Sequence, residues 1–185
     1  MRAFIAIEIP RDVKSELSQI IDTLRSSQAD VKWVKPQDVH LTLKFLGNID
    51  QSRLKEIQNI LDRVAKTENS FEMSMEDLSA FPNPSFPRVI WTGLKQGSQN
   101  TLDLAKKIEC ELAKIGFAKE KRPFHPHLTL GRLRSPKNRD KLSVLLSSTT
   151  FKSQSRIKVT HLNLIQSTLT PTGSIYTPLY QTALS

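Results

Sequence analysis

The motif His40-Leu41-Thr42-Leu43 returns, close to half a chain length later, as an identical copy, His127-Leu128-Thr129-Leu130. A repeat at this spacing predicts a protein built from two similar lobes. Apolar and polar residues alternate through both copies, which indicates a β-strand with one buried face. Because side chains two residues apart on a strand point the same way, each histidine shares a face with its threonine, and the leucines point into the core.

Strand and helix patterns alternate along the rest of the chain. The spacing of apolar residues predicts helices at residues 13–24, 54–64, 102–115 and 141–146. Extended patterns predict strands at residues 2–9, 31–34, 39–46, 71–81, 88–94, 127–133, 157–169 and 175–184, the last two forming a hairpin around Pro171-Thr172-Gly173. The first strand is apolar on both faces, which predicts that it is buried on both. The order predicts an α+β fold with helices packed on the outside of two antiparallel-type sheets.

The length of the chain sets its domain organisation. A chain of 185 residues has room for one domain of ordinary size. We expect a single bilobal domain, residues 1–185, with approximate halves at 1–85 and 86–185 and a possible exchange of terminal strands between them. A pseudo-twofold axis between the lobes would bring two imidazoles and two hydroxyl groups together in one central cleft.

The charge of the chain points to a polyanionic partner. It carries 27 Lys and Arg against 18 Asp and Glu, a formal net charge of +9. Much of this excess lies between residues 114 and 141, around the second motif, where only Glu120 and Asp140 oppose a series of lysines and arginines. Such a surface favours RNA or nucleotide phosphates as partners.

Composition and short motifs exclude several other classes of protein. The single Cys110 excludes a disulfide framework and a cysteine-based zinc site. The acidic residues are scattered, which disfavours a two-metal nuclease, and neither a P-loop nor a nucleophile elbow is present. The apolar run at the N-terminus is too short for a signal peptide or a membrane span. We therefore expect a cytoplasmic monomer with no membrane partner.

Paired histidines and threonines suit in-line displacement at phosphorus. Imidazole has an unperturbed pKa of about 6.5, so His40 and His127 can hold opposite protonation states near neutral pH. The neutral ring accepts a proton from water, and the charged ring gives one to the leaving alkoxide. Thr42 and Thr129 can donate to the non-bridging oxygens, and Arg132 is a further candidate for phosphate binding. Such a site needs no metal and no cofactor.

Other residues near the motifs have weaker claims on function. We interpret His125 as a structural or cleft-edge residue and Lys44 as a weak candidate for phosphate binding. His161-Leu162-Asn163-Leu164 imitates the motif, but it lacks the threonine and has no second copy, so we interpret it as a sheet histidine. Three aromatic residues could either stack on a base or pack in the core: Phe45, Phe124 and Trp91.

The two His-Leu-Thr-Leu copies resemble the signature of the two-histidine phosphoesterases, His-x-Thr/Ser-x repeated twice. Within that superfamily the chain looks like the LigT-like RNA 2′,3′-cyclic phosphodiesterases. The segments that carry the likeness are Phe4-Ile5-Ala6-Ile7, Val39-His40-Leu41-Thr42-Leu43-Lys44-Phe45-Leu46-Gly47, Pro87-Arg88-Val89-Ile90-Trp91, Arg122-Pro123-Phe124-His125-Pro126-His127-Leu128-Thr129-Leu130-Gly131-Arg132 and the hairpin end from Gly173 to Tyr176. The resemblance covers essentially the whole chain.

The resemblance implies a bilobal α+β fold and a metal-free reaction that opens terminal 2′,3′-cyclic phosphates of RNA or nucleotides to 2′-phosphates. It also implies roles that the two identical motifs cannot distinguish, with His40 as proton donor to the leaving 3′ oxygen and His127 as proton acceptor from water. Two alternatives stay open. One is an RNA 2′–5′ ligase that runs the reverse type of reaction, and the other is a non-catalytic RNA-binding module.

Overall fold

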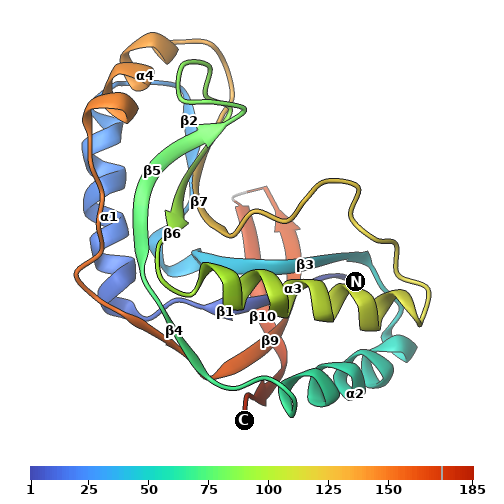
Figure 1. Cartoon of the computed structure of the whole chain (residues 1–185). Coiled ribbons are helices and arrows are strands. Elements are labelled where there is room, and N and C mark those ends of the chain that lie inside the picture. The colour runs from blue at the N-terminus through green and yellow to red at the C-terminus, as the bar shows by residue number, and fades with distance from the viewer. Residues whose placement is uncertain (172) are drawn as a thin grey trace.

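The structure is a computed structural model that describes residues 1–171 and 173–185 (Figure 1). Its elements follow in the order β1 (Arg2–Glu8), α1 (Arg11–Arg25), β2 (Val31–Trp33), η1 (Pro36–Asp38), β3 (His40–Asn48), η2 (Gln51–Arg53), α2 (Leu54–Ala65), β4 (Phe71–Met73), β5 (Met75–Phe81), β6 (Val89–Leu94), α3 (Ser98–Ala113), β7 (His127–Leu133), α4 (Arg139–Ser148), β8 (Ile157–Val159), β9 (His161–Thr170) and β10 (Gly173–Ala183). The alternation of helices and strands that the sequence predicts is confirmed.

Two four-stranded sheets form the body of the molecule. The first sheet has the strand order β10-β9-β1-β3, and the second has the order β2-β7-β6-β5. All neighbouring strands within both sheets are antiparallel. A short antiparallel pair, β4 with β8, completes the structure. The α+β class with antiparallel sheets is therefore confirmed.

Each sheet takes strands from distant parts of the chain. The C-terminal hairpin β9–β10 joins the first sheet beside β1, whereas β2 leaves the N-terminal region to pair with β7 in the second sheet. Buried apolar residues form a core that is continuous across both sheets, from Ile5 and Leu41 to Ile90 and Leu128. The two sheets thus share one core.

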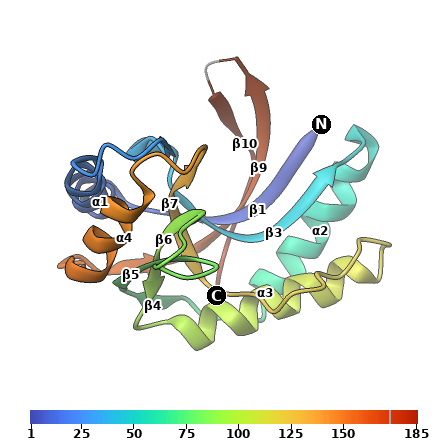
Figure 2. The ribbon, with the colours of Figure 1, turned by 90° about the horizontal axis from the view of Figure 1, so that it is seen from above.

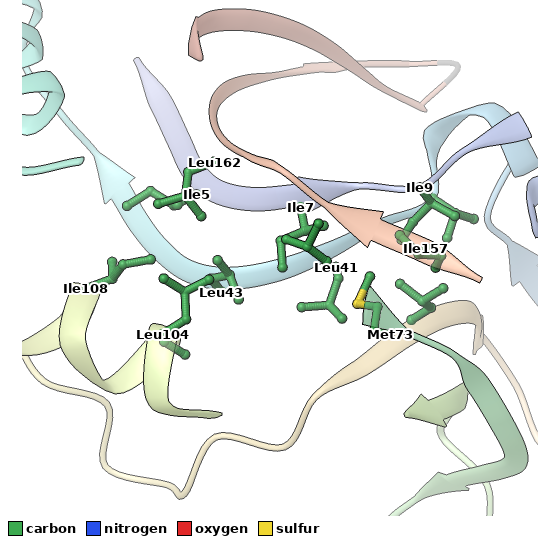
Figure 3. Packing of buried hydrophobic residues seen from close by; sticks show 14 of the residues in the cluster. Ile5, Ile7, Ile9, Leu41, Leu43, Met73, Leu104, Ile108, Ile157 and Leu162 are labelled. Carbon is green, nitrogen blue, oxygen red and sulfur yellow. The ribbon is translucent and has the colours of Figure 1, made fainter. Parts of the chain in front are cut away.

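Helices flank both sheets. In Figure 2, α2 and α3 lie beside the first sheet, and α1 and α4 lie on the other side of the molecule, beside the second sheet. Figure 3 shows how Leu104 and Ile108 of α3 approach Leu43 of β3 within the core. Helix α1 turns a regular stripe of apolar residues inward: Val13, Leu17, Ile21 and Leu24. This spacing of three and four residues is the one that predicts the helix from sequence.

Two strands that the sequence predicts as continuous are each divided. The predicted strand 71–81 breaks at Ser74 into β4 and β5, and the predicted strand 157–169 breaks at Thr160 into β8 and β9. The first parts, β4 and β8, pair with each other. The second parts, β5 and β9, enter different sheets. At the first break the backbone of Ser74 bonds to that of residues 95 and 96 instead of continuing its ladder. The partners that impose these breaks are far away in sequence, so a local pattern does not reveal them.

The predicted C-terminal hairpin is confirmed. Strands β9 and β10 pair from Gly173 opposite Thr170 to Ala183 opposite His161, with one register shift between Pro178 and Tyr180. The turn predicted at Pro171-Thr172-Gly173 includes Thr172, which lies outside the described residues.

Candidate active site

The two motifs lie on β3 and β7, and burial alternates along both as the sequence predicts. The motif leucines are buried, whereas each histidine and each threonine is partly exposed. The two strands contact each other where the sheets meet. A backbone hydrogen bond of 2.8 Å from Val34, on the segment leading into β3, to the carbonyl of Leu130 on β7 ties them together. The fold therefore brings the two copies of the motif to one junction.

Both imidazoles are held by the same backbone contact. His40 Nδ1 lies 2.8 Å from the carbonyl oxygen of Asp38, and His127 Nδ1 lies 2.7 Å from that of His125. Because a carbonyl oxygen can only accept, Nδ1 of each ring carries the hydrogen and donates it. Nε2 is then the nitrogen that can take up or release a proton. The two rings are thus fixed in the same tautomer by the residue two positions earlier.

Burial lowers the pKa of both histidines below the ordinary value. For His40 the burial effect is the largest, the hydrogen bond to Asp38 raises the pKa, and the charges of Lys14 and Asp38 act in opposite directions. For His127 burial again dominates, the hydrogen bond to His125 raises the pKa, and the charges of His125 and Arg132 both lower it. At pH values above the ordinary histidine pKa, both rings of the free protein are therefore mostly neutral.

Aromatic rings enclose His40 on the first sheet. Phe4 of β1 stacks on the imidazole with ring centroids 4.5 Å apart, and Tyr176 of β10 meets it edge-on at 5.0 Å. Phe45 lies 6.1 Å from Phe4 and is 57% exposed. His40 therefore has an apolar setting with one aromatic ring left open to solvent.

A different aromatic group surrounds His127. Phe81 of β5 meets the imidazole edge-on at 5.2 Å, and Trp91 of β6 lies 6.2 Å away. Trp91 is buried, and Phe124 is half-buried against the core. Both rings therefore pack, whereas Phe45 keeps the exposure that base stacking would need.

A β-bulge follows the threonine in each motif strand. On β3, Thr42 pairs with Ala6 but Lys44 already pairs with Ile5, so Leu43 is the extra residue. On β7 the register shifts in the same way, which makes Leu130 the extra residue. A bulge of this kind reverses the alternation of side chains beyond it. The two motif strands are therefore alike in conformation as well as in sequence.

The bulges decide where the next side chains point. Lys44 turns inward and is only 4% exposed; its Nζ donates to Glu109 Oε1 at 3.0 Å, to the carbonyl of Ala118 at 2.8 Å and to Glu120 Oε1 at 3.4 Å. This lysine ties residues 118–120 to α3 and β3 and does not lie beside His40. Sequence alternation alone places Lys44 on the histidine face, because it carries no sign of the bulge.

Arg132 holds the first outward-facing position after the bulge of β7, which corresponds to that of Phe45 on β3. It is exposed, pairs with Val89 across the sheet and lies beyond the bulge on the side of Thr129 and His127. Its charge lowers the pKa of His127. Thr42 and Thr129 are half-buried beside their histidines. His127, Thr129 and Arg132 thus share one face of β7. His40 and Thr42 share one face of β3.

His161 lies apart from this arrangement. It begins β9, opposite Ala183, and its Nδ1 is 2.8 Å from the hydroxyl of Thr160 instead of a backbone carbonyl two residues earlier.

Within residues 1–171 and 173–185, no group of three or more His, Cys, Asp or Glu side chains is arranged to hold a metal ion. In the same described part of the chain, no helix is long and apolar enough to cross a membrane.

An α+β fold with two histidine–threonine strands at the junction of its sheets is the arrangement of the two-histidine phosphoesterases. The model of the family described as LigT like Phosphoesterase matches residues 7–91 and 94–176. The chain belongs to this family.

Known proteins resemble this chain in sequence and in fold over nearly its whole length. An RNA 2′,3′-cyclic phosphodiesterase of Methanothermobacter thermautotrophicus is 37% identical over 179 residues, which cover 97% of this chain and 96% of the relative. One of Methanocaldococcus jannaschii is 34% identical, covering 95% and 96%. Among solved structures, the Thermus thermophilus protein TT0787 superposes with a TM-score of 0.86 at 27% identity, covering 100% of this chain and 98% of that one. Escherichia coli LigT complexed with 3′-AMP has a TM-score of 0.78 at 25% identity, with the same coverage.

Proposed function

We propose that this protein is a hydrolase that opens 2′,3′-cyclic phosphates at the ends of RNA or nucleotides to 2′-phosphates, with His40 and His127 as acid and base. One observation carries the proposal: two histidines on adjoining strands are held by the same Nδ1 contact, which leaves Nε2 of each available for proton transfer. The names of the relatives from Methanothermobacter and Methanocaldococcus support the substrate class.

The reaction follows from the free Nε2 atoms. Nε2 of neutral His127 accepts a proton from a water molecule as the water oxygen attacks phosphorus. The bond from phosphorus to the 3′ oxygen breaks, and Nε2 of protonated His40 gives its proton to that oxygen. The product carries a 2′-phosphate and a 3′-hydroxyl, and the proton taken by His127 returns to His40 through solvent before the next turnover. Each histidine would contribute on the scale of a general acid or base, about 10²–10⁴-fold.

The substrate itself helps to set the protonation states. Burial lowers the pKa of both histidines, but an anionic phosphate placed between them raises the pKa of a neighbouring imidazole. The hydroxyls of Thr42 and Thr129 and the guanidinium of Arg132 would hold the non-bridging oxygens and stabilise the charge that develops there. Because these side chains can stabilise the negative charge of the transition state, we propose a mechanism without metal or cofactor.

The basic segment 114–141 would bind the rest of the RNA chain. Figure 1 shows this segment running from the end of α3 to the start of β7 and on to α4, so cations lie before and after His127 along the chain. The buried contacts of Lys44 fix residues 118–120, at the start of this route. The 3′-AMP complex of the Escherichia coli protein supports a site that accepts a nucleotide. We further propose that the protein acts as a cytoplasmic monomer, which size-exclusion chromatography with light scattering tests for the oligomeric state.

Two alternatives share parts of this surface. A 2′–5′ ligase would use the same histidines but let a 5′-hydroxyl replace water, so it predicts joined product when cyclic-phosphate and 5′-hydroxyl RNA ends are mixed. A non-catalytic RNA-binding module needs only the basic segment. It therefore predicts that RNA binding persists in His40→Ala and that no cyclic phosphate is opened by the unaltered protein.

The deciding experiment is incubation with a 2′,3′-cyclic nucleotide followed by identification of the product. Phosphorus NMR with 2′- and 3′-phosphate standards separates the two regiochemical outcomes, and parallel reactions contain EDTA. We expect a 2′-phosphate at a rate that EDTA does not change. A predominant 3′-phosphate would overturn the assignment of the leaving oxygen. Loss of activity in EDTA that added metal restores would overturn the metal-free mechanism.

A further inference from the structure

The two motifs differ at the residue that holds the imidazole. In both, the backbone carbonyl two positions before the histidine accepts the Nδ1 hydrogen, at 2.8 Å for His40 and 2.7 Å for His127. The side chain on that residue is a carboxylate in the first copy, Asp38, and an imidazole in the second, His125. The same backbone contact is therefore made by residues whose side chains act on the pKa of the neighbouring catalytic imidazole in opposite directions.

We propose that this position breaks the symmetry of the site: Asp38 favours the protonated form of His40, and His125 favours the neutral form of His127. The first histidine is thereby made the acid and the second the base. Asp38 and His125 act through the catalytic rings, so they are positioning residues. The catalytic meaning of this inference rests on the proposed function, whereas the difference in proton affinity does not.

Beyond the aromatic rings, charges of both signs act on the pKa of His40. Asp38 of η1 and Lys14 of α1 act on its pKa in opposite directions, after the larger effects of burial and the backbone hydrogen bond. Lys14 is held near by a hydrogen bond from its Nζ to the carbonyl of Gln37, 2.9 Å long. Glu8 of β1 pairs with His40 in register, and the ring of Tyr176 meets it from β10. Lys14 has the larger effect of the two, and Asp38 offsets part of it in favour of the protonated ring.

The charges around His127 act in one direction. His125, whose ring centroid is 6.3 Å away, and Arg132 on the same strand both lower the pKa of His127, in addition to burial. The elements packed against this ring contribute Phe81 from β5 and Trp91 from β6, which carry no charge. His125 is exposed, and its ring lies 4.9 Å from that of Trp91. Its place beside the tryptophan keeps it near His127, where a positive charge opposes protonation of the catalytic ring.

The direct test is an NMR titration of the two catalytic rings, which needs no substrate. In Asp38→Asn, which keeps the size of the side chain and the backbone carbonyl, the midpoint of His40 should move to lower pH. In His125→Phe, which keeps an aromatic ring against Trp91, the midpoint of His127 should move to higher pH. In each variant the other catalytic ring should move less, because the two rings are coupled only through their mutual charge.

Two matched variants separate this position from general electrostatics. Asp38→Glu keeps the charge and should leave the His40 midpoint close to that of the unaltered protein. Glu8→Gln removes a carboxylate from the residue paired with His40 and should move that midpoint less than Asp38→Asn does. An equal or larger shift in Glu8→Gln, or no shift in Asp38→Asn or in His125→Phe, would overturn the proposal.

The pH dependence of kcat/KM on a 2′,3′-cyclic nucleotide gives a second readout. Because burial lowers both pKa values, the bell-shaped profile of the unaltered protein should peak below pH about 6.5. Asp38→Asn should move the alkaline limb to lower pH, where His40 loses its proton earlier. His125→Phe should move the acidic limb to higher pH, where His127 gains its proton earlier. If the protein opens no cyclic phosphate while the NMR shifts occur, the proposed function fails and the difference in proton affinity stands.

Discussion

Strands β3 and β7 are the same through the motif and differ directly after it. Both carry His-Leu-Thr-Leu, both hold the imidazole through the carbonyl two residues earlier, and both bulge at the second leucine. Beyond the bulge, β3 continues with Lys44 and Phe45 and β7 with Gly131 and Arg132. The duplicated part is the part that orients a histidine, and the parts that differ give each lobe its own surface. We expect the histidine chemistry to depend on both lobes equally, and substrate binding to depend on them unequally.

Loss of either histidine should have the largest effect on the reaction. His40→Ala or His127→Ala should lower kcat by at least about 10²–10⁴-fold, because each removes one partner of the proton transfer. The double variant should cost little more than either single variant, since the two rings act as a unit. Turnover of a 2′,3′-cyclic nucleotide under saturating conditions measures both. Near-normal turnover in one single variant would break the equivalence of the two strands.

The residues beyond the bulges should separate phosphate binding from base binding. Arg132→Ala should raise KM about tenfold and make RNA binding less dependent on salt, by about one unit of the log–log slope for each lost phosphate contact. Phe45→Ala, at the matching position of the other strand, should weaken binding of nucleotides without changing that slope. Fluorescence titrations of an RNA oligomer at several salt concentrations measure both quantities. Equal slopes in Arg132→Ala and in the unaltered protein would remove the arginine from the phosphate site.

Much of this site could be predicted from the sequence because its repeat and its alternation are local. The period-2 pattern is sufficient to place each motif histidine beside its threonine and to bury the leucines, and the structure confirms that burial. The same pattern is wrong for Lys44, which the bulge at Leu43 turns into the core. A bulge depends on the register between a strand and its partner. The partner of β3 is β1, which is separated from it in the sequence by α1 and β2.

The hydrogen bonds that hold the imidazoles are also beyond the reach of sequence patterns. Asp38 looks like a turn residue, and His125 looks like an edge residue beside the motif. Only the backbone path shows that their carbonyl oxygens accept from the catalytic rings. The pairing of β2 with β7 is missed for a related reason, because a three-residue strand carries too little pattern to name its sheet.

The inward-facing residues after the bulges should affect stability more than chemistry. Lys44→Met leaves Glu109 without one of its hydrogen-bonding partners and should lower the free energy of unfolding by about 1–3 kcal/mol. Gly131→Ala should cost a similar amount, about 1–3 kcal/mol, for a steric reason. Its new Cβ would lie 2.7 Å from Val31 Cγ1 and 2.8 Å from Trp33 Cε3. Urea unfolding measures both changes.

Hydrogen exchange distinguishes the two causes. Lys44→Met should loosen residues 118–120, because the lysine donates to the carbonyl of Ala118 and to the carboxylate of Glu120, and it should therefore also weaken RNA binding. Gly131→Ala should instead loosen β2, which packs against the glycine. Turnover of a small cyclic nucleotide should change only a few-fold in either variant. Faster exchange in the same segment for both variants would show that the inward positions of the two strands are not independent.

The smallest effect is expected at the histidine that imitates the motif without its surroundings. In His161-Leu162-Asn163-Leu164 the two leucines are buried, as they are in the true copies, but the residue in the place of threonine is a buried asparagine whose Oδ1 accepts from Gln181 at 2.8 Å. The contact of His161 Nδ1 is to the hydroxyl of Thr160, so the backbone device that fixes the tautomer in the true copies is replaced by a side chain. His161→Ala should therefore leave kcat/KM for a 2′,3′-cyclic nucleotide within a few-fold of the unaltered protein, measured beside His40→Ala under the same conditions. A fall as large as that of His40→Ala would mean that the histidine pair is wrongly assigned.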